Sequence, residues 1–192
     1  MLRIALASIA GVIVVIAGLV FFQAGVFDRV KFFEEQRGPY FLVYKEHTGT
    51  YSAVGARIKS VHTHLSETNK SAVVKGGFTI FYDNPIDKDD DSLRSISGVL
   101  TDSLMTVDSP YKSDTFGKSY CIIGKYPLRS FFSYSTGIYK IYSSLDKYAK
   151  SKNTTITGPV MEIVDTNKKS ILYVVPVSAT AAVPVFGMKN GQ

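Results

Sequence analysis

A long apolar run near the N-terminus limits how this chain can fold. Residues Ile4 to Phe22 read IALASIAGVIVVIAGLVFF and include no charged side chain. A helix rises about 1.5 Å per residue, so a run of about nineteen residues covers nearly the whole hydrocarbon core of a membrane, roughly 30 Å. Lipid offers no partners to backbone polar groups, and a helix satisfies them within one segment. The run therefore predicts a transmembrane anchor over residues 1–24, and membrane as a partner.

A cleaved signal peptide is the main alternative for this run. Arg3 supplies a short positive region before it. However, the run is longer than the usual 7–15 residues of a signal peptide, and it ends in Phe21-Phe22-Gln23 rather than at a small-x-small cleavage site. A hydrophobic segment buried in a soluble protein is a second alternative. The pattern favours the uncleaved anchor.

The charges that flank the run predict its orientation. Arg29, Lys31 and Arg37 follow it closely, whereas only Arg3 and the amino terminus precede it. Cytoplasmic flanks carry the excess of Lys and Arg. The C-terminal body is therefore expected in the cytosol.

Cysteine usage agrees with a cytosolic body. The chain has one cysteine, Cys121, so it forms no intramolecular disulfide. Two glycosylation tripeptides begin at Asn69 and Asn153. Such tripeptides occur often by chance, and we expect both to be unused.

Composition points to one domain that has no nucleic-acid partner. The chain has 192 residues and a formal net charge of +6, and its lysines are scattered rather than gathered in a stripe. A tether over residues 25–39 leaves about one domain's length of chain. Tyrosine and phenylalanine number twelve each, a large stock of ring surface for a core or an apolar pocket.

The first half of the body predicts a strand, a helix and two strands. Strands are expected over residues 40–46, 78–82 and 93–101, where aromatic and β-branched residues gather. Between the first two strands, apolar residues recur at helical spacing. They are Tyr51, Val54, Ile58, Val61 and Leu65.

The second half repeats this order. Strands are expected over residues 119–125 and 130–135, a helix over 138–149, and a hairpin of strands over 160–164 and 171–177. Thr48-Gly49-Thr50-Tyr51 in the first half recurs as Thr136-Gly137-Ile138-Tyr139 in the second, and each is expected to open a helix. The repetition indicates an internal duplication.

Two such βαββ units predict an α+β domain over residues 40–178, with pseudo-repeats 40–102 and 118–178 and a C-terminal tail over 179–192. Their strands would pair into one antiparallel sheet with both helices on one face. The other face would then be free, and concave through the usual twist of a sheet.

Three segments resemble a known family. They are Tyr44–Tyr51, then Phe81–Pro85 with Ser97–Leu100, and Met161-Glu162-Ile163. Their order resembles the GyrI-like, or bacterial transcription-activator effector-binding, superfamily, whose fold is of the SHS2 type. Within it, the testis-expressed ER-phagy receptor family is the more similar. The resemblance implies a single-pass protein of the endoplasmic reticulum membrane, with a cytosolic module that binds a small molecule or a protein.

One part of the receptor family's pattern is missing. That family uses a disordered acidic tail with an aromatic-x-x-aliphatic motif that binds Atg8-family proteins. Residues 178–192 contain Phe186-Gly187-Met188-Lys189 and no acidic residue. The resemblance therefore extends to the fold and the anchor, and an autophagy role would need an Atg8-binding partner in trans.

Glu162 is the leading candidate for a ligand-binding residue. It lies in an expected strand, where its neighbours on the same face are Val160 and Val164. A carboxylate among apolar side chains is costly unless it is paired or neutral. The resemblance implies that a glutamate here faces a pocket and meets cationic or electrophilic ligands, and we expect a small hydrophobic or cationic ligand as partner. Tyr44, Tyr82, Phe132 and Tyr134 are the candidate pocket walls.

Two alternative functions stay open. Some members of the superfamily hydrolyse small electrophiles with a pocket glutamate, which would make Glu162 catalytic. Haem-binding proteins share the duplicated fold, and His47, His62 or His64 would then offer an axial ligand. We find no catalytic constellation and no metal-ligand spacing in the sequence, so we expect a binding protein without a cofactor rather than an enzyme.

Overall fold

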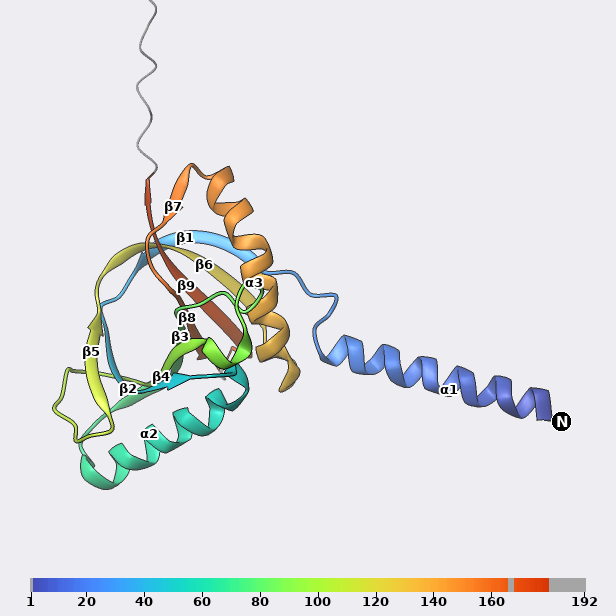
Figure 1. Ribbon diagram of the computed structural model, residues 1–192, viewed down its shortest axis with the longest axis horizontal. Helices are drawn as coiled ribbons and strands as arrows, with labels where there is room; N and C mark the ends of the chain where they lie inside the picture. Colours follow the sequence, from blue (N-terminus) through green and yellow to red (C-terminus); the bar gives the residue numbers. More distant parts are fainter. Residues whose placement is uncertain (1, 166–167, 180–192) are drawn as a thin grey trace, which may run out of the picture.

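The computed structural model describes residues 2–165 and 168–179 (Figure 1). Its helices are α1 (Leu2–Gln23), α2 (Val54–Thr68) and α3 (Phe132–Ser151), with short 3-10 turns η1 (Tyr51–Ala53) and η2 (Asp90–Ser92). Its strands are β1 (Lys31–Arg37), β2 (Tyr40–Thr48), β3 (Val74–Phe81), β4 (Arg94–Thr101), β5 (Lys112–Phe116), β6 (Ser119–Pro127), β7 (Thr154–Ile156), β8 (Val160–Asp165) and β9 (Ser170–Ala179).

The structure corrects the expected membrane anchor. The apolar run does form helix α1, which projects away from the rest of the molecule (Figure 1). Within the described residues, however, no helix has both the length and the apolar character needed to cross a membrane. The expected fold with an N-terminal transmembrane helix is therefore wrong.

The segment that follows α1 is fixed to α3. Lys140 Nζ donates hydrogen bonds to the backbone carbonyls of Val26, at 2.6 Å, of Gly25, at 3.2 Å, and of Asp28. Arg129 pairs with the Asp28 carboxylate through Nε at 2.6 Å and Nη2 at 2.9 Å. Charged groups make the stronger hydrogen bonds in proteins. The chain between α1 and β1 is thus held against the start of α3.

The strands form one antiparallel sheet in the order β1-β6-β9-β8-β3-β4-β2-β5, with β7 on the end of β9. Residues 31–37, which lie in the expected tether, form its edge strand β1 and pair with β6. At the other edge β5 pairs with β2. Each edge strand is joined by a short link to a strand beside the opposite edge, β1 to β2 and β5 to β6. The two edges must therefore approach each other, and the sheet curls (Figure 1). At Gly38 (φ +86°) a Cβ would lie 2.8 Å from the Gly117 carbonyl oxygen, so these links cross closely.

Two similar units meet at the centre of this sheet. The first is β2-α2-β3-β4 and the second is β6-α3-β8-β9, and β3 of one pairs with β8 of the other. In this central pair Thr79 lies directly opposite Glu162. The α+β class and the large antiparallel sheet are confirmed.

Both α2 and α3 cover the same face of the sheet. Val61 and Leu65 of α2 cluster with Val43 and Val99, and Ile138, Ile141 and Leu145 of α3 cluster with strand residues such as Ile122 and Val175. Along each strand, these residues alternate with residues whose side chains point to the other face of the sheet, where they form a third cluster. That cluster includes Leu42, Phe78, Ile80, Ile123, Met161 and Val174, all buried. The expected free concave face is therefore wrong, because the curled sheet fills it with its own side chains.

The chain enters α3 earlier than the sequence indicated. Residues 130–131 lie outside any strand and Phe132 begins the helix, so the expected strand over 130–135 is wrong. Ser133 Oγ accepts the backbone N–H groups of Arg129, at 3.0 Å, and Ser130, at 3.2 Å, which turns the chain after β6. Thr136-Gly137 lies inside the helix rather than at its start. The expected tail falls outside the described residues from position 180 onward.

Candidate ligand pocket

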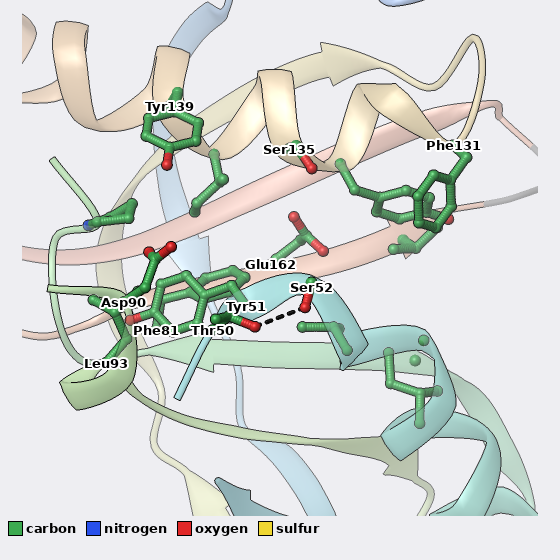
Figure 2. Close-up of a pocket in the computed structure, with 18 of the residues that line it drawn as sticks. Thr50, Tyr51, Ser52, Phe81, Asp90, Leu93, Phe131, Ser135, Tyr139 and Glu162 are labelled. Carbon is green, nitrogen blue, oxygen red and sulfur yellow. Dashed lines mark hydrogen bonds between the residues drawn. The ribbon is translucent and has the colours of Figure 1, made fainter. Parts of the chain in front are cut away.

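A cavity of about 630 Å³ lies between the N-terminal turns of α2 and α3, above the β3–β8 pair (Figure 2). Its size falls within the roughly 300–1,000 Å³ typical of small-molecule pockets. The residues that line it come from both halves of the chain. The cavity therefore lies on the helical face of the sheet, opposite to the face that the sequence analysis expected to be free.

Glu162 occupies the middle of the cavity floor. It belongs to β8, and only 3% of the residue is exposed to solvent. Met161 and Ile163 alternate with it and join the cluster on the other face of the sheet. Figure 2 shows its carboxyl group rising from the strand between Ser135 of α3 and Ser52 near the start of α2. Burial raises the pKa of Glu162 to about 8, because desolvation disfavours the charged carboxylate.

The polar groups beside Glu162 only partly offset this burial. The Tyr173 hydroxyl on β9 lowers the pKa of Glu162, though less than burial raises it. Tyr173 Oη is itself buried, and it has no hydrogen-bond partner of normal geometry in the described part of the chain. Opposite Glu162, Thr79 Oγ1 donates to Ser97 Oγ at 3.3 Å. At neutral pH Glu162 is therefore mostly protonated in the empty pocket.

Aromatic rings form one end of the cavity. The Tyr51 ring lies against Phe81, with 4.6 Å between centroids. Tyr51 Oη donates to the backbone carbonyls of Asp83, at 2.9 Å, and Arg94, at 3.2 Å, which fixes the ring. Tyr139 of α3 faces them across the cavity (Figure 2). Rings of this kind bind apolar groups and, through their faces, cations.

Glycines form the floor and wall at the other end. Gly55 of α2 and Gly76 and Gly77 of β3 line the cavity with Val164, which is directly beyond Glu162 on its face of β8. A Cβ on Gly55 would meet nothing within 4 Å. A glycine within an element often marks a place where a ligand approaches the backbone closely. This end of the cavity is thus open to a flat or bulky group.

A loop held by ion pairs closes the aromatic end. Pro85, Asp90 and Leu93 line the cavity from the loop between β3 and β4. At its base Arg94 Nη2 lies 2.9 Å and Lys88 Nζ 3.0 Å from Asp83 Oδ1. The hydrogen bond from Arg94 holds the pKa of Asp83 well below its usual range. The loop that closes this end is therefore held in place by the Asp83 carboxylate, which is paired with Arg94 and Lys88.

The cavity carries acidic groups without basic ones. Glu162 and Asp90 are its two carboxyl groups, and no lysine, arginine or histidine from the described residues lines it. Neither carboxyl group has an ion pair within residues 2–165 and 168–179. A ligand with positive charge would meet complementary charge here, and an anion would not.

The structure brings together two of the five residues predicted to bind a ligand. Glu162 and Tyr134 both line the cavity, and the nearby Glu162 carboxyl adds to the rise that burial causes in the pKa of Tyr134. Tyr44 instead packs against the cluster on the far face of the sheet. Tyr82 and Phe132 are about half exposed and lie outside the cavity lining.

Three further aromatic residues of the lining, Tyr51, Phe81 and Tyr139, were not predicted as pocket walls from the sequence. Tyr51 and Phe81 were assigned to a helix stripe and a strand, and Tyr139 to a helix start. Their shared position follows from the pairing of β3 with β8, which joins the two halves of the chain. The repeated Tyr51 and Tyr139 in the two related tetrapeptides were the available signal, since both line the cavity, Tyr51 from the turn just before α2 and Tyr139 from the first half of α3.

The histidines do not fit a haem site. His47, His62 and His64 are all absent from the residues that line this cavity. His64 instead stacks on Tyr111, with 4.0 Å between ring centroids, over a shallower groove on α2. Because no imidazole faces the cavity, the described residues supply no histidine ligand to a haem bound there.

Comparison with known proteins identifies the domain. A family of GyrI-like small-molecule-binding domains matches residues 31–176. No curated protein matches the sequence. The folds most like it include EcmrR in a complex with DNA, with a TM-score of 0.62 and 9% identity over 92% of this chain and 68% of that one.

Two further solved structures share the fold. A hydrolase from Listeria innocua has a TM-score of 0.51 and 12% identity over 78% of this chain and 93% of that one. SAV2435 bound to tetraphenylphosphonium has a TM-score of 0.52 and 13% identity over 77% of this chain and 94% of that one. At these identities the likeness concerns the fold alone.

Proposed function

This chain belongs to the family of GyrI-like small-molecule-binding domains, and we propose that it binds lipophilic cations in the pocket around Glu162. The observation that carries the proposal is a carboxyl group, 3% exposed, in a cavity of about 630 Å³ whose described lining includes no basic residue. A bound cation would supply the missing counter-charge. The rings of Tyr51, Phe81 and Tyr139 would contact the apolar part of the ligand.

Binding a cation would change the protonation state of Glu162. In the empty pocket desolvation keeps the carboxyl group mostly neutral at pH 7. An opposite charge within about 4–6 Å favours the ionised form. The cation would therefore displace a proton, and its affinity would increase as the pH rises toward about 8.

A relative supports this ligand class. SAV2435, which shares the fold, has been solved with tetraphenylphosphonium, a lipophilic cation. The support for the proposal lies in the combination of the family, the cavity and its charge in this chain.

The test compares two ligands of similar shape and opposite charge. Tetraphenylphosphonium and tetraphenylborate are titrated calorimetrically into the full-length protein at pH 8. We expect the cation to bind at least about tenfold more tightly, and Glu162→Gln to remove most of that preference. Glu67→Gln, which neutralises an exposed glutamate on α2, serves as the matched control. Equal affinities of the unaltered protein for the two ions would refute the proposal.

Hydrolysis of a small electrophile is the second candidate function. The supporting observation is the pKa of Glu162, about 8, which is close to the value that suits a general base at neutral pH. Tyr134 and Ser135 line the cavity on the helix opposite. In an enzyme, Glu162→Gln would abolish turnover and leave the binding of neutral ligands largely intact. Retained turnover in that variant would exclude this role for Glu162.

The remaining expectations stay predictions. The resemblance to the testis-expressed ER-phagy receptor family, a cytosolic protein partner and a location at the endoplasmic reticulum rest on the sequence segments described above. The absence of a nucleic-acid partner is also a prediction. Affinity purification of the tagged full-length chain, followed by immunoblotting for Atg8-family proteins, tests the receptor relation directly.

A further inference from the structure

We infer that the preferred ligand has two cationic centres, one bound at Glu162 and the other at Asp90. This inference rests on the proposed function, because it concerns the same pocket. Asp90 lines the cavity from η2, the short turn just before β4. Figure 2 shows its carboxyl group directed toward the space between Tyr139 on one side and Tyr51 and Phe81 on the other. The cavity thus has an acidic group at its middle and another at its aromatic end.

The charges around Asp90 leave it available for a ligand. Asp83, at the base of the same loop, is paired with both Arg94 and Lys88. Asp90 has no ion pair in the described part of the chain. The basic residues of this loop region are therefore already paired with another carboxylate. A ligand cation that reached Asp90 would not have to displace a basic side chain.

The two carboxyl groups are separated by an apolar stretch. Thr79 lies opposite Glu162, and Phe81 follows two residues further along β3 on the same face. One such step along a strand measures roughly 7 Å. Asp90 lies beyond Phe81 at this end of the cavity (Figure 2). Two separate cationic centres would therefore be needed to reach both carboxyl groups, since a single compact cation would reach only one.

The side chains between Glu162 and Asp90 suit a ligand with an apolar linker. Phe81 is 3% exposed, and Tyr51 lies against it. A methylene chain or an aromatic spacer would cover these rings without burying an unpaired polar group. The ligand class that fits is an elongated dication with an apolar middle.

The two charged contacts differ in strength. Glu162 is buried, so losing its contact should weaken binding strongly. Asp90 is exposed, and exposed ion pairs contribute up to about 1 kcal/mol. That value corresponds to a gain in affinity of about fivefold for the second centre. The gain should appear only in ligands that are long enough to span both groups.

The experiment uses two series of simple cations. Alkane-α,ω-bis(trimethylammonium) ions and alkyltrimethylammonium ions of the same chain lengths, from about four to about twelve methylene groups, are titrated into the full-length protein at low salt. We expect dications long enough to span both carboxyl groups to bind about fivefold more tightly than the matched monocations. Asp90→Asn should remove this gain, so it should weaken the binding of the dications more than that of the matched monocations.

A neighbouring aspartate provides the control. Asp91→Asn removes the same charge from the same turn, but Asp91 does not line the cavity. It should retain most of the gain. Equal affinities of dications and matched monocations, or an equal loss in both variants, would overturn the two-centre inference and leave the proposed function standing. If neither series binds and tetraphenylphosphonium does not bind either, the proposed function fails as well.

Discussion

Replacing Glu162 with glutamine should change how the stability of the protein depends on pH. The pKa of Glu162 is raised to about 8 by burial, whereas a glutamate in an unfolded chain has a pKa near 4.3. The folded protein therefore binds this proton more tightly. The corresponding stability is fully present below about pH 4.3, and it is lost progressively as the pH rises through about 8.

The size of the effect follows from the two pKa values. Their difference corresponds to about 5 kcal/mol in the free energy of unfolding between the two limits. This is an upper value, because water that enters the cavity beside the ionised carboxylate would reduce it. Glutamine has the shape of the neutral carboxyl group and does not ionise. The Glu162→Gln variant should therefore gain stability relative to the unaltered protein by at least about 2 kcal/mol between pH 5 and pH 9.

Urea unfolding followed by far-UV circular dichroism at several pH values measures this difference. The chain contains no tryptophan, so the circular dichroism of the backbone is the more direct signal. Glu67→Gln, at an exposed position on α2, should show no such trend. A constant difference between the Glu162→Gln variant and the unaltered protein across this pH range would refute the argument that burial keeps Glu162 neutral.

Three other substitutions test separate parts of the account. Gly55→Leu should raise the free energy of unfolding by about 0.5 kcal/mol, because leucine favours a helix more than glycine. It should also weaken the binding of tetraphenylphosphonium at least about tenfold, because the leucine side chain would fill part of the cavity. Thermal unfolding measures the first effect and calorimetry the second. Asp83→Asn should lower the free energy of unfolding at pH 7 through the lost pairing with Arg94. Because the pKa of Asp83 is lowered in the fold, this cost should shrink as the pH falls below about 4 in urea-unfolding experiments. Lys140→Met should speed hydrogen exchange in the segment around Val26, since it removes the donor to the carbonyls of Val26 and Asp28, whereas Gly25 keeps the hydrogen bond from Tyr126 Oη. Unchanged exchange would contradict that anchoring role.

The local periodicity of the sequence predicted most elements of the domain. The apolar stripe from Tyr51 to Leu65 predicted the position of α2, and alternation of residues placed Glu162 on the opposite face of its strand from Met161 and Ile163. These patterns depend on neighbours within one element. The α+β class followed from the repeated order of strands and helix.

Features that depend on long-range pairing were not predictable in this way. The sequence does not show that β1 pairs with β6 and β5 with β2, so it gave no sign that the sheet curls and fills its inner face. Tyr44 was therefore placed in a pocket, although it packs on that inner face. The early start of α3 depends on hydrogen bonds to Ser133 Oγ, which periodicity cannot show. The apolar run near the N-terminus predicted a helix correctly, whereas the expectation that this helix spans a membrane was wrong for the described residues.

Proton release on ligand binding measures whether a bound cation ionises Glu162. Tetraphenylphosphonium is titrated at pH 7 in two buffers of different ionisation enthalpy, and the difference in heat gives the number of protons released. With a pKa of about 8, Glu162 is roughly nine-tenths protonated at this pH. The account predicts the release of close to one proton for each cation bound, and none from the Glu162→Gln variant. Saturable binding of the cation to the unaltered protein without proton release would contradict it.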